Sequence, residues 1–410
     1  MDQTQLPSRD GETLVRRLWR LTDGDRLYFL SFSILMVSAL LSTSFYYGYF
    51  DGKPYMFLQI FCVALLAGYE WRNGIRNQNW IALIIAGALS LLSWRVSVGN
   101  LQRLVSLMFP YIYCARRIPF AKIARTALNL SIVTVSFIVL SGLLGIIENM
   151  SIYQVGRLRE FLGFRYVLYP SGILLNMTAL WVYLKKDTVN LTGTLIWAAV
   201  NLLTFLLTNG RTSFVMAEIL LFGGYLIARF PKLMEKLKPL WILAGGAFLL
   251  CGLFSWIVVL GYDTIEWMDP VNAFLGGRVG LAHQSLLDYG VSWFGKTIQW
   301  IGSGLDVDGV TTQGIYNYVD CLYVKVVQRY GILFSLTWMG LICWGMWRMI
   351  KRKEYQILLI SATVAVHCIF DDLSMDLHYN LFWMALGMVL INPSTLNWNG
   401  KTTAKNTPAD

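Results

Sequence analysis

The sequence predicts an all-α, polytopic membrane protein with about 12 transmembrane helices and one long extracytoplasmic loop. Of its 410 residues, 56% are hydrophobic and only 14% are charged, whereas roughly 25% of the residues of a soluble domain are charged. Apolar segments recur along nearly the whole chain, and no polar stretch is long enough to fold as a separate domain. A helix of roughly 20 apolar residues crosses a bilayer and pairs its own backbone groups there. We therefore expect one membrane domain.

The predicted spans are windows of apolar residues separated by polar turns. They cover residues 27–50, 54–71, 78–97, 100–115, 125–147, 166–184, 190–209, 211–229, 239–262, 331–348, 355–371 and 377–392. The window at 100–115 is the least regular, because it is short and contains Pro110. Residues 1–26 are expected to form a cytoplasmic tail, because the first apolar run is too long for a signal-peptide core. Residues 27–392 form the predicted membrane domain, and residues 393–410 a second cytoplasmic tail.

The net charge of +10 is distributed in a way that indicates membrane topology rather than nucleic-acid binding. Most basic residues lie in the two tails and in alternate turns, at 72–76, 116–125, 185–186, 229–238 and 348–353. Lys and Arg are enriched in the cytoplasmic loops of membrane proteins. This pattern predicts an even number of spans with both termini in the cytoplasm, and no nucleic-acid partner.

The long extracytoplasmic loop is predicted at residues 261–316. It has few charges and carries Trp267, Trp293 and Trp300, so it can lie on the membrane interface and cover a cleft. Asp306-Val307-Asp308 precedes Gly309 in this loop and is typical of a turn.

Several classes of chemistry are disfavoured. The six cysteines include no CxxC pair and mostly lie in apolar runs, so we expect neither disulfides nor a structural metal. The chain has no Walker loop, GxSxG or HExxH sequence. We expect no cofactor, and these features argue against a nucleotide-driven pump or a metal-dependent transferase that uses cytoplasmic nucleotide sugars.

Some basic residues are not explained by topology, and they are candidates to hold an anion. They are Lys53, Arg95, Arg103, Arg157, Arg159, Arg165, Arg211, Arg278, Lys296, Lys325 and Arg329. Arg211 begins a span in Thr-Asn-Gly-Arg-Thr-Ser, at a helix N-terminus that attracts negative charge. The alternative for Arg211 is an anchor to lipid headgroups.

Arg278 follows two glycines, which allow close backbone approach to a ligand. His283 and Asp288 follow at steps of five residues, and each step turns a regular helix by about 140°. Neither Arg278 nor Asp288 therefore shares a helical face with His283. We expect separate, solvated side chains, since a His283 and Asp288 pair requires a break in the helix.

Asp320 lies just before a predicted span. A carboxylate at such a position needs a charged or hydrogen-bonding partner, or has a functional role. A helix there would place Tyr316 and Tyr323 on the face of Asp320. Lys325 and Arg329 are four residues apart on another face, and Arg329 can equally be a helix-end anchor.

Three further polar groups have structural alternatives. The Arg157, Arg159 and Arg165 cluster is unusual on an outer loop, and a pair between Glu160 and a neighbouring arginine is the simpler explanation. His367 and Asp371 share a helical face, and we expect a structural pair. The third group consists of Asp372, Asp376 and His378. We expect it to be an ordinary polar loop rather than a site for a cation or for sugar hydroxyls.

Four stretches together resemble the polymerases that join lipid-linked repeat units of O-antigen, capsule or exopolysaccharide, which are related to the O-antigen ligases. They are Arg-Leu-Arg-Glu-Phe-Leu-Gly-Phe-Arg-Tyr before Pro170, the Arg211 motif, Gly-Gly-Arg at 276–278, and the segment from Val-Asp-Cys-Leu-Tyr to Arg-Tyr-Gly-Ile-Leu at 319–333. The likeness covers roughly residues 150–335. Relatives often have histidine or asparagine near the position of Asp320, so no histidine base is carried over to that place.

The resemblance implies a GT-C-like fold in a bacterial inner (plasma) membrane and a glycosyltransferase that uses an undecaprenyl-diphosphate-linked donor and acceptor. Its candidate partners are a chain-length regulator and a flippase, besides the lipid bilayer. Arg211 and Arg278 would bind the diphosphate, with Arg157, Arg159 or Arg329 assisting. Asp320 would deprotonate the acceptor hydroxyl, with His283 as the reserve candidate.

Two alternatives stay open at this stage. A lipid-linked oligosaccharide flippase also has many spans and basic cavities, but we expect its charges at mid-membrane depth in broken helices. A glycan ligase uses the same donor chemistry, and the sequence barely separates it from a polymerase.

Overall fold

The computed structural model describes residues 24–74, 78–97, 99–154, 156–305, 310 and 314–396. Most of both predicted tails lies outside these residues, as do Asp306 and Asp308 of the predicted turn. The division of the chain into two tails and one membrane domain stays a prediction.

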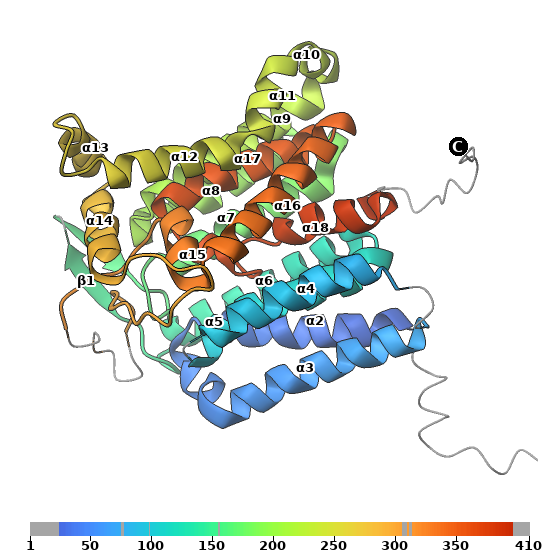
Figure 1. Ribbon diagram of the computed structural model, residues 1–410, viewed down its shortest axis with the longest axis horizontal. Helices are drawn as coiled ribbons and strands as arrows, with labels where there is room; N and C mark the ends of the chain where they lie inside the picture. Colours follow the sequence, from blue (N-terminus) through green and yellow to red (C-terminus); the bar gives the residue numbers. More distant parts are fainter. Residues whose placement is uncertain are drawn as a thin grey trace, which may run out of the picture.

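The described chain is mostly helical, and a helix lies in each predicted apolar window (Figure 1). The helices are α2 (Gly24–Leu41), α3 (Gly52–Arg72), α4 (Trp80–Arg95), α5 (Gly99–Cys114), α6 (Phe120–Leu143), α7 (Tyr169–Lys185), α8 (Leu191–Thr208), α9 (Arg211–Arg229), α10 (Pro231–Lys236), α11 (Lys238–Gly245), α12 (Ala247–Leu260), α13 (Met268–Phe274), α14 (Arg278–Tyr289), α15 (Leu322–Tyr330), α16 (Ile332–Lys351), α17 (Tyr355–Phe370) and α18 (Phe382–Ile391). An antiparallel hairpin of β1 (Ser151–Gln154) and β2 (Arg157–Glu160) adds a small sheet that the sequence did not predict.

Several helices are suited to a membrane. By length and apolar composition, α6, α8, α9 and α16 can each cross a bilayer, and α11 with α12 forms a further candidate that is bent by 56°. The apolar helices α4, α17 and α18 are shorter. With 10 residues, α18 is about 15 Å long, because the chain before it forms a loop instead of continuing the helix over the window 377–392. The chain is thus a helical protein with membrane-type helices, and the number of its spans stays a prediction.

Large apolar side chains cover the outer faces of these helices. Phe137 and Leu140 of α6, Leu203 of α8 and Ile257 of α12 are each more than half exposed. Soluble monomers rarely expose contiguous apolar patches larger than a few hundred Å². These faces are therefore compatible with hydrocarbon rather than with water.

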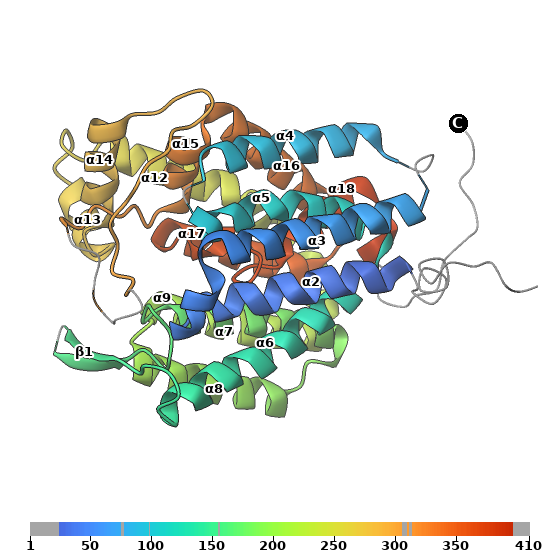
Figure 2. The ribbon, with the colours of Figure 1, turned by 90° about the horizontal axis from the view of Figure 1, so that it is seen from below.

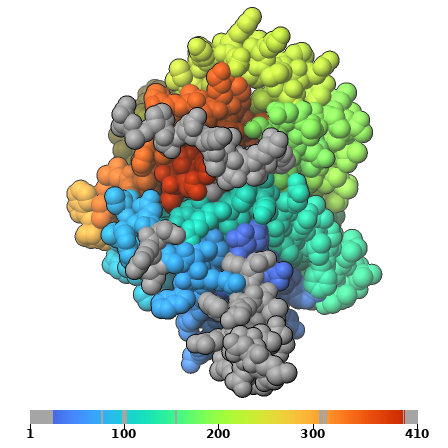
Figure 3. Space-filling view, turned by 90° about the vertical axis from the view of Figure 1, so that its right-hand side faces the viewer, coloured from blue at the N-terminus to red at the C-terminus, as the bar shows by residue number. Residues whose placement is uncertain are grey.

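The helices divide the molecule into two ends. At one end, Lys186 Nζ lies 3.5 Å from Glu354 Oε2 and Lys353 Nζ lies 2.8 Å from Glu235 Oε1, so the basic turns after α7, α9 and α16 are gathered there. Figure 3 views this end, with the yellow-green segment around α10 and α11 at its top. The hairpin, α13 and α14 lie at the opposite end (Figures 1 and 2). We name this opposite end the loop end.

Part of the long loop is fixed to the junction of α15 and α16. The backbone amides of Ile332 and Leu333, at the start of α16, donate to the carbonyls of Ser292 (3.0 Å) and Trp293 (3.1 Å). Gly331 separates the two helices with φ 94° and ψ 167°, a conformation that is essentially confined to glycine. A Cβ on Gly331 would lie only 2.6 Å from the Phe294 carbonyl carbon. The loop and the helix junction can therefore meet only through glycine.

We predict that Gly331→Ala destabilises the folded protein. An alanine in the backbone conformation of Gly331 is strained, which alone costs roughly 1–3 kcal/mol. The new methyl group also meets backbone atoms that cannot rotate away. Thermal unfolding of the purified chain in detergent, followed by size-exclusion fluorescence, measures the effect. Gly340→Ala is the matched control, since a Cβ there meets nothing within 4 Å. Equal melting temperatures for the two variants would contradict the prediction.

Candidate functional site

Two adjoining cavities lie at the loop end. The first, the Asp320 cavity, has a volume of about 200 Å³ and is lined by Arg165, Tyr166, Leu168, Tyr169, Arg278, Gly302, Ser303, Gly304, Tyr316, Tyr318, Asp320, Asp371, Asp372 and Leu373. The second, the Asp376 cavity, has a volume of about 250 Å³ and is lined mainly by α5, α15 and the loop between α17 and α18. Tyr169, Tyr318, Asp372 and Leu373 line both cavities, so they form a shared wall.

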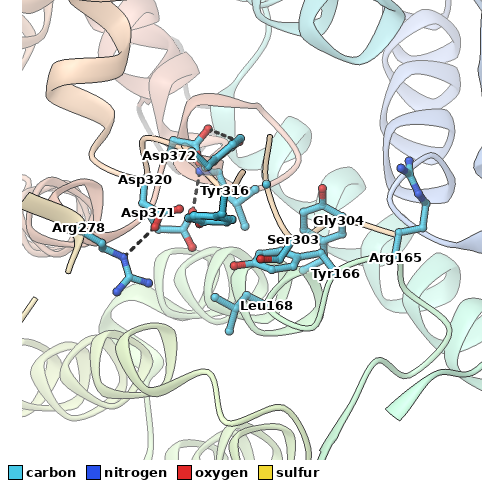
Figure 4. Close-up of a pocket in the computed structure, with 14 residues that line it drawn as sticks. Arg165, Tyr166, Leu168, Arg278, Ser303, Gly304, Tyr316, Asp320, Asp371 and Asp372 are labelled. Carbon is cyan, nitrogen blue, oxygen red and sulfur yellow. Dashed lines mark hydrogen bonds and ion pairs between the residues drawn. The ribbon is translucent and has the colours of Figure 1, made fainter. Parts of the chain in front are cut away.

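Arg278 and Asp320 meet in the first cavity, as Figure 4 shows. Gly276 and Gly277 both have positive φ (67° and 80°), which turns the chain into α14 at Arg278. The guanidinium Nε of Arg278 lies 3.1 Å from Asp320 Oδ2, and its Nη1 donates to the Leu275 carbonyl at 3.1 Å. Both predicted site residues are thereby brought together, although 41 residues of chain separate them.

The Asp320 carboxyl group has an unusual environment. Burial raises its pKa to about 6, and the Arg278 guanidinium limits the rise. Asp320 precedes α15 and is not helical, so the expected face shared with Tyr316 and Tyr323 is wrong. Tyr316 still lines the cavity, whereas the Tyr323 hydroxyl donates to the Ala365 carbonyl at 2.7 Å. A carboxyl group that titrates near neutral pH can accept a proton from a bound molecule.

Two further aspartates belong to the site, and sequence reasoning placed them elsewhere. Asp371 and Asp372 follow α17 and line the first cavity. Asp372 Oδ2 accepts hydrogen bonds from Lys325 Nζ (2.5 Å) and from the Tyr318 hydroxyl (3.1 Å). The supposed polar loop is instead folded inward, with His378 also buried. The sequence did offer one signal for this inward position, because carboxylates next to a long apolar run need partners inside the protein.

The expected side-chain pair of His367 and Asp371 is wrong. The two ring nitrogens of His367 lie 3.1 Å from the Ser213 and Ser374 hydroxyl oxygens. Asp371 Oδ1 accepts from the Leu373 amide at 2.8 Å. His367 thus links α9 to the loop after α17 and does not orient Asp371.

Arg159 and Arg211 lie close enough to influence each other electrostatically. The Arg159 Nε donates to the Thr208 carbonyl at 2.9 Å, which brings β2 to the turn between α8 and α9. Burial and the nearby charge of Arg211 lower the pKa of Arg159. Tyr166, which lines the cavity, lies within electrostatic range of Arg159. Two adjacent guanidinium groups repel each other unless an anion lies between them, so this position is suited to an anion.

The turn that carries Arg211 is fixed by close packing. Asn209 ends α8 in the left-handed conformation (φ 56°), and α9 begins two residues later. A Cβ on Gly210 would lie 2.7 Å from Ser171 Cβ of α7, so only glycine fits there. Arg211 itself is exposed and does not line either cavity. Arg157 on the hairpin is likewise exposed, and the structure does not bring it to the cavities.

His283, the reserve candidate for a base, lies away from both cavities. Its Nδ1 is 2.7 Å from the Val259 carbonyl oxygen and its Nε2 is 2.9 Å from Asp263 Oδ2. Asp288 instead accepts a hydrogen bond from Gln284 at 2.8 Å. The expectation that His283 and Asp288 do not pair is confirmed, but His283 has a carboxylate partner from another part of the loop.

Arg329 belongs to the second cavity. Its side chain is buried, its Nη2 donates to the Ile298 carbonyl at 2.9 Å, and its guanidinium carbon lies 4.6 Å from the centre of the Trp300 ring. An exposed helix-end anchor is therefore excluded. Lys325 lies next to it, 3.6 Å from the centre of the Tyr318 ring.

Part of the long loop is held beside the first cavity by hydrogen bonds to Arg165. Leu305 donates its amide to the Arg165 carbonyl at 2.8 Å, and its own carbonyl accepts from Arg165 Nε at 2.6 Å. Gly302, Ser303 and Gly304 then line the cavity from this side. The structure thus holds this part of the loop beside the cavity, and the covering of a cleft by the whole loop stays a prediction.

The comparisons with known proteins give no relative. No family model matches the chain, and neither a curated protein nor a solved structure does so. Among the described residues, no group of three or more His, Cys, Asp or Glu side chains is placed to hold a metal ion. A function must therefore be argued from the side chains of the two cavities.

We predict that the Asp320 carboxyl group titrates at about pH 6, and that Arg278→Gln moves this midpoint upward. The substitution removes the cation that favours the ionised form. The measurement is the protonated carboxyl stretch in infrared spectra of wild type minus Asp320→Asn, recorded across pH. Asp288→Asn, which removes an exposed carboxyl group that lines neither cavity, is the control for the difference spectra. A downward shift in Arg278→Gln would contradict the assigned pair.

Proposed function

We propose that the protein is a polysaccharide polymerase, which joins undecaprenyl-diphosphate-linked oligosaccharide repeat units at the outer face of a bacterial inner membrane. The observation that carries the proposal is the cavity at one end of an apolar helical molecule, in which Arg278 pairs with Asp320 and which Arg165 also lines. Glycosyl transfer from a lipid diphosphate needs a base and fixed positive charge. At the loop end of the molecule, Asp320 is the candidate for the base and Arg278 for the fixed positive charge.

The proposed reaction is one displacement at the anomeric carbon of the donor glycan. The acceptor hydroxyl oxygen forms a bond to this carbon, the bond from the carbon to the diphosphate oxygen breaks, and the hydroxyl proton passes to Asp320. Negative charge then grows on the departing undecaprenyl diphosphate. Arg211 and Arg159 stabilise this charge at the rim, and Arg278 does so inside the cavity, without requiring a metal ion.

Arg278 has a second part in this scheme. Its charge limits the pKa of Asp320, so that a useful fraction of the carboxyl group is ionised at neutral pH and still basic enough to take a proton. The loop strand at Leu305 keeps water from the reacting carbon. Arg329, in the second cavity, is left without a role at the diphosphate.

The membrane arrangement is part of the proposal. With about 12 spans and both termini in the cytoplasm, the loop end faces outward and the basic turns face inward, in agreement with the enrichment of Lys and Arg in cytoplasmic loops. The polyprenyl chains of both substrates would lie against the exposed apolar faces of the helices. A chain-length regulator and a flippase are the partners that such a polymerase requires.

A lipid-linked oligosaccharide flippase is the second candidate. Lys325, Arg329 and Asp372 are charged groups in the interior, next to helices that are short or interrupted, and transporters often bind substrates at such breaks. A glycan ligase would share the donor chemistry of the polymerase. The products made in cells separate these activities.

We predict that Arg211→Ala and Arg278→Ala each abolish the ladder of polymer lengths in a deletion strain. Each removes positive charge from the departing diphosphate, and the loss of one such group typically costs about 10²–10³ in rate. Gel analysis of the lipid-linked glycans, with membrane levels checked, gives the result. Arg125→Ala is the control, since Arg125 is exposed on α6 and outside both cavities.

The same gels discriminate between the candidates. Single repeat units on the carrier in the deletion strain support the polymerase. If no repeat unit reaches the outer face, the flippase replaces it, and one-step capping of a different acceptor indicates a ligase. A normal ladder from both arginine variants would overturn the proposed roles.

We predict that the rate of chain growth in membrane vesicles rises as the pH increases through about 6. The reason is that Asp320 can act as the base only when it is deprotonated. Asp320→Asn should lower the rate by roughly 10²–10⁴ and remove this pH dependence. Arg278→Gln should shift the remaining activity to higher pH. A wild-type profile that falls as the pH rises through 6 would exclude Asp320 as the base.

A further inference from the structure

The reaction proposed above assigns no role to the Asp376 cavity, although polar side chains in the interior line it. Arg329, His378 and Tyr379 line it and are each at least nine-tenths buried. Arg329 Nε, His378 Nε2, the Tyr379 hydroxyl and Asp376 Oδ1 have no hydrogen-bond partner among the described residues. A buried polar group without a partner costs roughly 1–3 kcal/mol. All four atoms belong to residues that line one cavity, which makes this cavity a candidate to hold a bound molecule.

The charges of the cavity select the chemistry of this molecule. Lys325 and Arg329 can only donate hydrogen bonds, whereas the Asp372 carboxylate, which is paired with Lys325, accepts them. Asp376 accepts when it is ionised and can also donate when it is protonated. A phosphate or a carboxylate would be repelled by the two aspartates, and a metal cation by the lysine and the arginine. Hydroxyl groups both donate and accept, so a neutral, polyhydroxylated molecule matches the whole set.

The remaining walls fit the faces of a sugar ring. Leu104 and Val105 of α5, Leu322 and Val326 of α15, and Met375 provide apolar surface beside the polar groups. A pyranose has apolar faces with hydroxyl groups at its edge, and this division matches the cavity. The volume of about 250 Å³ is below the range of pockets that enclose drug-sized ligands, which limits the occupant to about one ring.

We propose that the Asp376 cavity binds the terminal sugar ring of the acceptor glycan. This inference rests on the proposed polymerase function and deepens it. The reducing end of a lipid-linked glycan is attached to its carrier, so only the non-reducing end can enter a cavity for one ring. The shared wall of Tyr318 and Asp372 then lies between this ring and Asp320. The ring thereby presents its hydroxyl groups toward the side on which Asp320 lies, and Asp376, His378 and Tyr379 determine which sugar is accepted.

The test is saturation-transfer NMR on the full chain, purified in detergent, with a panel of methyl glycosides. The panel contains glucose, galactose, mannose, rhamnose, N-acetylglucosamine and N-acetylgalactosamine. We expect saturable binding of at least one glycoside, weakened roughly fivefold in Tyr379→Phe and in Asp376→Asn, since each variant loses one hydrogen bond to the ligand. Asp288→Asn is the matched control outside the cavity and should bind as wild type does.

Tyr379→Phe separates a role in binding from a role in folding. The Tyr379 hydroxyl has no hydrogen-bond partner within the part of the chain that the structure describes, so its removal should leave the melting temperature unchanged or raise it while binding weakens. Absence of binding by every glycoside overturns the inference, as does equal binding in wild type and both cavity variants. If glycosides bind but the deletion strain keeps its ladder, the polymerase function fails and the sugar site stands. If the ladder is lost and no glycoside binds, only the sugar site fails.

Discussion

Lys325 of α15 reaches Asp372 in the loop after α17, with 2.5 Å between Nζ and Oδ2. The contact joins the two segments that supply most of the charged side chains of both cavities. Breaking a buried ion pair by removing one partner typically costs about 3–5 kcal/mol, because the other charge is left uncompensated. The Tyr318 hydroxyl also donates to Asp372, and its ring faces Lys325. The pair thereby sets the position of the wall between the cavities.

Burial gives neighbouring carboxyl groups different properties at the loop end. Asp320 and Asp376 have pKa values of about 6 and about 7, both raised chiefly by burial and lowered again by nearby cations. Arg278 and Lys325 act on Asp320, and Lys325 and Arg329 act on Asp376. Lys325 therefore links the two carboxyl groups electrostatically, although they line different cavities.

The helices could be predicted from the sequence, whereas much of the site could not. Apolar windows mark helices because a membrane leaves few other ways to pair the backbone. The shorter α18 and the inward loop from Asp371 to His378 have no such pattern. Arg278 and Asp320 were identified as separate candidates, but their contact depends on an irregular segment without a hydrophobic period. For the same reason, the partner of His283 proved to be Asp263, which periodicity could not indicate.

The contact of the long loop with the junction of α15 and α16 has a consequence for how this sequence can change. A Cβ on Gly331 meets backbone atoms of residues 293–295, and a Cβ on Gly295 meets backbone atoms of Arg329 and Tyr330. Side chains that collide can be trimmed by a second mutation, but main-chain atoms are common to every residue. No suppressor substitution at a contacting position can therefore rescue a loss of either glycine. Selection is expected to act on the two positions as one unit.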